Sequence, residues 1–168
     1  FDGNPGSLVL EVDAMNQRFK SLQPQEKAIL RAIRRLYLAG IFEEKENFSL
    51  PRIKLLCEKL YGLMKTPEYQ WHEWFENLNR AGFLKISGKD KIWAEEAYLL
   101  RVVAPWELEK LLVVLKDDPR ALFLLGNRTS SLGDIRIEKA EFMKISIAAY
   151  TEALKVYTPA AFPVQYAA

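Results

Sequence analysis

The sequence has few of the residues on which disulfide-linked, metal-binding and membrane proteins depend. Its only cysteine, Cys57, excludes an intramolecular disulfide and a cysteine-based metal site. No apolar run approaches the ~18 residues of a membrane span, and these residues show no signal-peptide pattern. Lysine and arginine (24) barely exceed aspartate and glutamate (22), so the net charge is only +2. That is far from the strongly basic balance of a dedicated nucleic-acid binder. We therefore expect a cytoplasmic protein in a reducing compartment, with no membrane partner.

The sequence contains enough apolar residues to form a hydrophobic core. Of its 168 residues, 49% are hydrophobic and 12% are aromatic, which allows one domain or two small ones. Phe1 stands where an initiator methionine would, and the last residues carry the pattern of a helix that is just beginning. We therefore interpret the chain as a piece of a larger protein.

Three helical patterns follow one another in the first half of the chain. The first begins at Pro24, which suits a first helical turn, and ends at Gly40. The second begins at an N-cap, Ser49, and its apolar stripe consists of Ile53, Leu56, Cys57, Leu60 and Met64. The third begins at Thr66-Pro67-Glu68, with Thr66 as the expected N-cap, and carries Trp71, Trp74, Phe75 and Leu78 on one face. At this helical spacing the tryptophans are typical of a core.

A β-hairpin pattern comes directly after these helices. Gly88-Lys89-Asp90 has the composition of a tight turn, and Leu84, Ile86 and Ile92 alternate with lysines around it. We also expect a short edge strand near Ile41 and Phe42. Three helices and a two-stranded wing have the order of a winged helix-turn-helix domain, to which we assign residues 24–103. Periodicity leaves open whether residues 94–103 extend the last strand or begin a helix.

Two groups of basic residues are candidate contacts for nucleic acid or another anionic partner. They are Lys27, Arg31, Arg34 and Arg35 on the first helix, and Lys85, Lys89 and Lys91 on the wing. A basic helix face is more often plain solvated surface, and lysines on edge strands also prevent aggregation. In a helix-turn-helix the third helix reads the DNA, but here its outward residues Glu68, Glu73 and Glu76 outweigh Arg80. Phosphates would be repelled by this face, so binding of nucleic acid is disfavoured.

No catalytic arrangement is visible. His72 and Glu76 stand four residues apart on one helix, but a third metal ligand is not in sight. Cys57 lies in the middle of an apolar stripe with no histidine or cation beside it, so we interpret it as a core residue. We expect no enzyme activity, no metal and no cofactor in this chain.

The N-terminal residues carry a family resemblance. The segment GNPGSLVL, in residues 3–10, resembles the Gly-x-Pro segment that closes the nucleotide-binding core of STAND-type, AAA-like P-loop NTPases. In that family a winged helix follows. Apart from this resemblance, the spacing of Val12, Met15 and Phe19 predicts a helix at about residues 11–22, and the residues alone indicate that 1–23 are a linker with a docking helix.

A second resemblance covers the C-terminal part, residues 104–168. After a bridging helix from Pro105 to about Lys116, the segments ALFLLGN and KISIAAYTEALKVYTPAAFPVQYA resemble one tetratricopeptide repeat and the start of the next. The family pattern matches Leu125, Gly126, Ala149, Tyr150, Ala153 and Leu154, with Phe162 and Tyr166 in the following helix. Gly126 and Tyr150 are further apart than in a standard repeat, so we expect an enlarged turn at residues 130–137. Because a single repeat leaves a face uncovered, we also expect an exposed apolar surface near Val156, Phe162, Val164 and Tyr166.

The expected fold is therefore mainly α, a winged helix-turn-helix followed by a tetratricopeptide-like helical hairpin. The order of elements is similar to that of STAND proteins, in which such a module couples a nucleotide-binding core to a sensor array. This implies a non-catalytic regulatory module of a signalling NTPase. Its partners would be proteins: the upstream core, downstream helical repeats and a second copy of itself. The alternative is a winged-helix transcriptional regulator that binds DNA.

Overall fold

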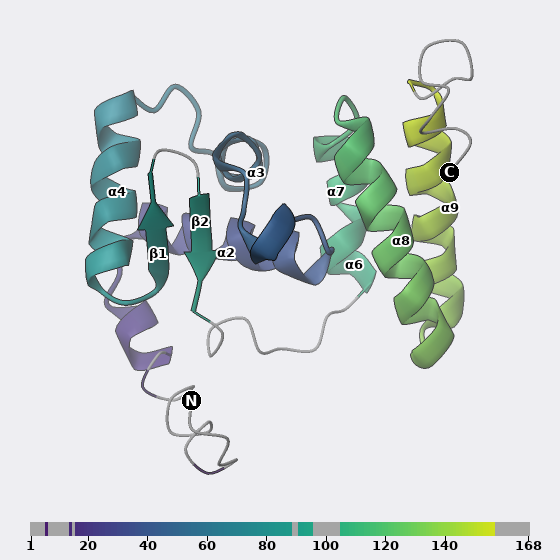
Figure 1. Ribbon diagram of the computed structural model, residues 1–168, viewed down its shortest axis with the longest axis horizontal. Coiled ribbons are helices and arrows are strands. Elements are labelled where there is room, and N and C mark those ends of the chain that lie inside the picture. Colours follow the sequence, from purple (N-terminus) through teal and green to yellow (C-terminus); the bar gives the residue numbers. More distant parts are fainter. Residues whose placement is uncertain (1–5, 7–13, 15, 89–90, 96–104, 157–168) are drawn as a thin grey trace. The chain divides into compact units, whose positions relative to one another are not determined.

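The chain is mainly helical, with one small two-stranded antiparallel sheet (Figure 1). The computed structural model describes residues 6, 14, 16–88, 91–95 and 105–156. These residues cluster into two units, one within Phe1–Tyr37 and Phe42–Val102, the other within Leu38–Ile41 and Val103–Ala168. Each unit is described separately below.

The first helix of the first unit, α2 (Pro24–Leu38), follows the apolar spacing of its sequence. Ile29, Ile33 and Leu36 are fully buried, as residues three and four positions apart share one helix face. The chain leaves the helix through Gly40, whose φ of +70° is a conformation that glycine adopts without a Cβ penalty. Residues 16–20 before α2 are helical as well. Residues 11–13 and 15 of the predicted docking helix lie outside the described part.

Helix α3 (Leu50–Tyr61) begins and ends with the expected capping residues. The Ser49 hydroxyl accepts a hydrogen bond from the Arg52 backbone N–H, and Gly62 at φ +72° donates its N–H to the Cys57 carbonyl. The predicted stripe is correct for Ile53, Leu56 and Cys57, which are buried. It is wrong for Met64, which lies beyond the helix end and is 64% exposed, because Gly62 turns the chain away first.

Helix α4 (Glu68–Arg80) buries the four apolar side chains predicted for its inner face. Trp71 and Trp74 contact each other edge to face, with ring centroids 5.5 Å apart. The expected N-cap is wrong. Thr66 donates its hydroxyl hydrogen to the Leu63 carbonyl, and Pro67 occupies the cap position without a side-chain hydrogen bond.

The predicted hairpin forms from β1 (Leu84–Ser87) and β2 (Lys91–Ala94), which pair antiparallel. Leu84 and Ile92 lie on the face that packs inward and are buried. The expected edge strand at Ile41 and Phe42 is wrong. In the described residues, a single bridge from Phe48 to Ile92 extends the sheet on the β2 side. In this bridge the Phe48 N–H donates a hydrogen bond to the Ile92 carbonyl at 2.8 Å.

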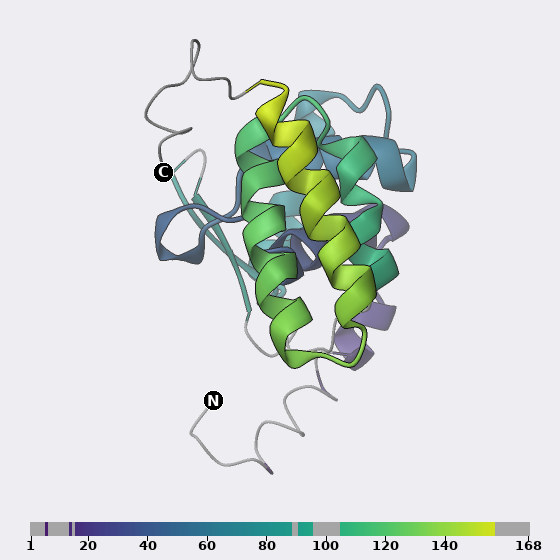
Figure 2. The same ribbon diagram turned by 90° about the vertical axis from the view of Figure 1, so that its right-hand side faces the viewer.

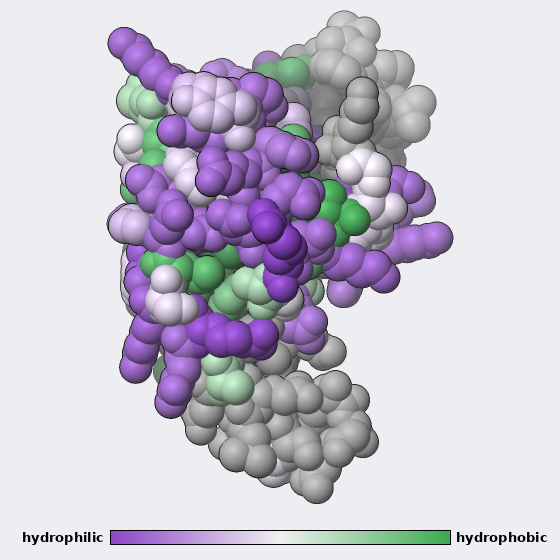
Figure 3. All heavy atoms as spheres, turned by 90° about the vertical axis from the view of Figure 1, so that its left-hand side faces the viewer, coloured by the Kyte–Doolittle hydropathy of each residue, from purple (hydrophilic) through white to green (hydrophobic). Residues whose placement is uncertain are grey.

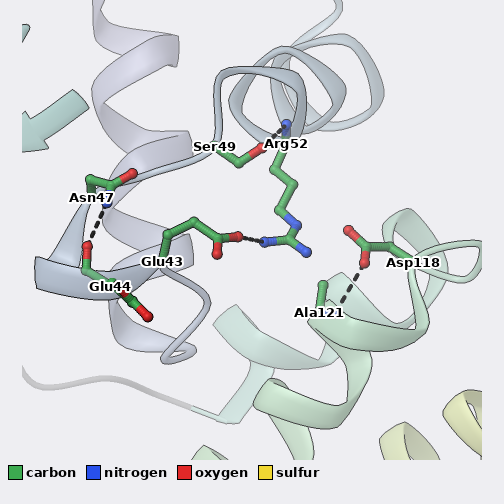
Figure 4. A network of polar contacts seen from close by, with 7 residues as sticks. All are labelled: Glu43, Glu44, Asn47, Ser49, Arg52, Asp118 and Ala121. Carbon is green, nitrogen blue, oxygen red and sulfur yellow. Dashed lines mark hydrogen bonds and ion pairs between the residues drawn. The ribbon is translucent and has the colours of Figure 1, made fainter. Parts of the chain in front are cut away.

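A network of polar contacts holds the loop between α2 and α3 (Figure 4). The Arg52 guanidinium points at the Glu43 carboxylate, with 3.0 Å between Nη1 and Oε1. The Asn47 side-chain amide donates to the Glu44 carbonyl, and the loop contains the single-turn helix η1 (Glu44–Glu46). Lys45 sits in this turn at φ +59°, and its carbonyl accepts a hydrogen bond from the Trp93 indole at 2.8 Å. The hairpin and this loop are thereby joined.

The described residues of the second unit from Pro105 onward form two short and two long helices. The predicted bridging helix is divided at Lys110 into α6 (Pro105–Glu109) and α7 (Leu111–Val114). Asp118 caps α8 (Pro119–Ile135) by accepting a hydrogen bond from the Ala121 N–H at 3.0 Å (Figure 4). The last described helix is α9 (Lys139–Leu154), which runs beside α8 as a helical hairpin (Figure 2).

Small residues let α8 and α9 approach closely. Gly126 faces the Tyr150 ring so tightly that a Cβ would lie 2.6 Å from Tyr150 Cε1. The Ser146 hydroxyl donates to the Gly126 carbonyl at 2.9 Å, and Ala149 is fully buried. The expected enlarged turn at residues 130–137 is wrong, because α8 continues to Ile135. The additional residues lengthen the helix instead of the loop.

Among the described residues, no helix combines the length and the apolar character that crossing a membrane requires.

Candidate functional site

The basic residues predicted on the first helix do not form a continuous exposed strip. Arg34 and Arg35 are buried, at 8% and 9% exposure. Lys27 and Arg31 both lie over the ring of Phe19, with 5.8 and 5.6 Å to its centroid. The Lys27 ammonium also donates to the Lys20 carbonyl at 3.0 Å. This face of α2 thus holds the helical turn before it by cation–π contacts, rather than presenting four free cations.

The hairpin sorts its residues by face. Lys85 stands opposite Trp93 and Ser87 opposite Lys91, and side chains alternate along each strand. Both lysines are exposed on the outer face, whereas Ile86 and Ile92 lie together on the inner face. The third predicted wing lysine, Lys89, lies outside the described residues.

A groove of about 660 Å³ runs between α4, the first turns of α3 and the inner face of the hairpin. It is lined by Leu50, Lys54, Glu68, Tyr69, Trp71, His72, Phe75, Glu76, Ile86, Gly88 and Ile92. Its floor is apolar, since Trp71, Phe75 and Ile92 are almost entirely buried. Tyr69 is 70% exposed and stands at its edge.

The α4 residues of the groove recur with helical spacing. Glu68, His72 and Glu76 lie four residues apart, share one side of the helix and line the groove, whereas the exposed Glu73 does not line it. Figure 3 shows the side of the molecule on which α4 lies. Hydrophilic residues cover most of it, with small hydrophobic areas between them.

The charges in the groove do not cancel. The Lys54 ammonium pairs with the Glu68 carboxylate at 2.6 Å and lies 5.7 Å from the centroid of the Trp71 ring. Glu76 forms no ion pair with any described residue. The nearby Arg80 guanidinium donates instead to the Glu76 carbonyl and, at 2.9 Å, to the Asn77 side chain. Lys54, the one described lysine that lines the groove, is thus used within it, and the Glu76 carboxylate has no cationic partner among the described residues.

Two kinds of chemical group, metal ligands and the thiol, can be located in the described residues. The described residues contain no group of three or more histidine, cysteine, aspartate or glutamate residues placed to hold a metal ion. Burial, with a smaller contribution from Glu58, raises the pKa of the Cys57 thiol to about 12. A thiol with such a pKa remains protonated at neutral pH and is a poor nucleophile.

The second unit has a smaller groove of about 630 Å³ between α6, α7 and α9. Trp106 is 55% exposed at its edge, and the Lys110 ammonium lies 5.6 Å from the centroid of its ring. Glu109, Glu138 and Glu141 line this groove together with Lys144. Unlike the groove of the first unit, it has no floor of buried aromatic rings.

The residues matched to the repeat pattern occupy different positions. Leu125, Gly126, Ala149 and Ala153 are buried where α8 and α9 pack. Tyr150 is half-buried against Phe123, with ring centroids 5.8 Å apart, and Leu154 is 50% exposed. Val156 is 40% exposed, whereas Phe162, Val164 and Tyr166 lie outside the described residues.

The sequence reasoning did not find the groove of the first unit. Its members come from α3, α4 and both strands, and no spacing along the chain connects them. Two residues could have indicated the groove from the sequence. Leu50 and Tyr69 are a large apolar and an aromatic residue that lie outside the core stripes of their helices.

In comparisons with known proteins, no family model, no curated protein and no solved structure matched the chain.

Proposed function

We propose that the chain is a non-catalytic protein-interaction module of a larger cytoplasmic signalling NTPase. In this proposal its first unit is a winged helix-turn-helix and α8 with α9 is a tetratricopeptide-like hairpin. The module connects a nucleotide-binding core upstream to helical repeats downstream. The order of three helices and a hairpin, followed by closely packed antiparallel helices, supports this assignment. So does the similarity of the GNPGSLVL and ALFLLGN segments to the corresponding family patterns.

The acidic outward side of α4 is the observation that carries the proposal. In a DNA-binding winged helix this helix would enter the major groove between two rows of phosphates. Here Glu68 and Glu73 are exposed, and Glu76 has no described ion-pair partner. Binding to DNA draws most of its affinity from cations that neutralise phosphates, and this helix side offers Arg80 alone. A surface of this charge is suited to protein partners.

The alternative is a DNA-binding regulator, and one observation favours it. Lys85 and Lys91 are both exposed on the outer face of the hairpin, where a wing can contact the phosphate backbone. Fluorescence anisotropy with a labelled mixed-sequence duplex at ~50 and ~200 mM KCl separates the two functions. For the proposed module we expect DNA binding that does not saturate at ~100 μM protein, which corresponds to the weak end of non-specific DNA affinities. Micromolar binding that falls steeply with salt, and that is lost in a Lys85→Ala/Lys91→Ala variant, would establish the alternative.

The NTPase part of the proposal has its own test. We expect the coding sequence upstream of Phe1 to contain a G-x-x-x-x-G-K-[ST] element at a junction between a strand and a helix. The protein encoded by the whole reading frame should then bind ATP in an equilibrium assay with a fluorescent ATP analogue. An upstream sequence without this element contradicts the proposal.

A further inference from the structure

We infer that the groove between α4 and the hairpin binds a basic amphipathic segment of a partner protein, with a bulky apolar side chain on the floor and a lysine or arginine at Glu76. This inference rests on the proposed function as a protein-interaction module and names the chemistry of one partner. It concerns the first unit only, in which every residue of the groove lies.

The apolar part of the argument comes from the floor. A volume of about 660 Å³ lies within the range of sites that hold ligands, roughly 300–1,000 Å³. Trp71 and Phe75 line it there with aromatic side chains, and Ile86 adds an aliphatic wall from β1. Tyr69, which is mostly exposed, can cover a side chain that enters. Aromatic residues of this kind are enriched at the centres of protein interfaces, because their large rings exclude water at little cost in conformational entropy.

The electrostatic part comes from Glu76. Its carboxylate lines the groove without a described cationic partner, while Lys54 is already held by Glu68 and the Trp71 ring. An incoming ammonium or guanidinium would complete an ion pair at the edge of an apolar site, where water screens the charges less than at an open surface. An incoming carboxylate or phosphate would instead be repelled, because it would bring a second negative charge next to the unpaired Glu76 carboxylate. The groove therefore selects cationic partners and rejects acidic peptides and nucleic acid.

The two described lysines of the hairpin, Lys85 and Lys91, lie away from the groove. The register places Lys85 and Lys91 on the outer face, opposite to Ile86 and Ile92. Neither lysine lines the groove. The two faces of the same hairpin thus differ in charge, and only the inner face opens toward the acidic side of α4.

The test uses the 168-residue chain and two fluorescein-labelled synthetic peptides. One peptide carries a tryptophan among alternating lysines and leucines, and the other has every lysine replaced by glutamate. We expect the basic peptide to bind in anisotropy titrations, and the acidic peptide to bind at least about tenfold more weakly. In ¹H–¹⁵N correlation spectra, the basic peptide should shift the Trp71 indole signal and the amides of Tyr69, Glu76 and Ile86.

Glu76 and Glu73 supply matched variants on the same helix. Glu76→Lys should weaken binding of the basic peptide at least about tenfold, because it places a like charge at the proposed contact. Glu73→Lys changes the net charge equally but lies outside the groove, so its effect should stay within about threefold. Tyr69→Ala should weaken binding of both peptides without altering the melting temperature, because its side chain is exposed.

Four outcomes overturn the inference. The first three are equal losses in the Glu73 and Glu76 variants, equal binding of the two peptides, and peptide-induced shifts confined to residues away from the groove. Absence of binding at ~1 mM peptide, the weakest affinity that specific recognition would show, overturns it as well. The proposed function fails separately, on an upstream sequence without the phosphate-binding element or on tight DNA binding by Lys85 and Lys91.

Discussion

Replacing Gly126 by alanine tests the close approach between α8 and α9. The new Cβ would lie 2.6 Å from Tyr150 Cε1 and 2.8 Å from Cδ1, well inside van der Waals contact. The ring cannot easily move aside. Its hydroxyl donates to Asn127, and its face contacts Phe123 at 5.8 Å between centroids. Either the ring or one of the two helices must therefore shift.

Two opposing terms set the magnitude. Alanine is favoured over glycine in a helix interior by about 1 kcal/mol. Overpacking of a close contact costs about 1–3 kcal/mol. We therefore expect Gly126→Ala to destabilise the second unit by about 1 kcal/mol. In a Tyr150→Ala background the clash is absent, so the same change should stabilise the unit by up to about 1 kcal/mol. The double-mutant cycle should give a coupling energy of about 1–3 kcal/mol.

Gly133 is the matched control in the same helix. A Cβ there would lie 2.8 Å from Met143 Sδ, but the unbranched methionine side chain can adopt another rotamer. Gly133→Ala should therefore be neutral or stabilise by up to about 1 kcal/mol.

Native-state hydrogen exchange of the α8 and α9 amides is the appropriate assay, because it reports the opening free energy of this unit by itself. If Gly126→Ala stabilises the unit as much as Gly133→Ala does, and shows no coupling to Tyr150, the close packing of Gly126 against Tyr150 is wrong.

Two further predictions concern a helix cap and the buried thiol. Asp118→Ala should lower the stability of the second unit by about 0.5–2 kcal/mol in urea unfolding, because the Ala121 N–H loses its acceptor. Asp117→Ala, next to it and exposed, should change the stability by less than about 0.5 kcal/mol. The pKa of Cys57 is raised from 9.0 to about 12 in the folded chain. Below pH ~9 the thiol is protonated in both the folded and the unfolded chain. Between pH ~9 and ~12 it ionises only in the unfolded chain, so the free energy of unfolding should fall by about 1 kcal/mol per pH unit. Cys57→Ala should remove that part of the slope, and an unchanged slope in urea titrations at pH ~9 and ~11 would contradict the raised pKa.

The sequence by itself determined the helices and the hairpin of the first unit, because their signals are local. Ser49 with Pro51 marks the start of α3, and a glycine follows each of α2, α3 and α4, where the chain needs a left-handed residue. The spacing of Trp71, Trp74, Phe75 and Leu78 identified the buried face of α4 correctly. Hydrogen bonds and side-chain neighbours within one helical turn decide such features, so they can be predicted from the residues nearby.

Only the tertiary structure decided which polar residues are accessible and which apolar ones meet. The sequence pattern predicts that Arg34 and Arg35 lie on a solvated helix face, but both are buried. Their exposure depends on segments from elsewhere in the chain that pack against the helix. The contact of Gly126 with Tyr150 has the same origin, since the length of α8 sets which residues of α9 lie opposite. The groove at Glu76 brings together Leu50, Phe75 and Ile86, and its uncompensated charge follows from Lys54 pairing with Glu68. Contacts between distant segments depend on how whole elements pack, and no periodicity along the sequence encodes that packing.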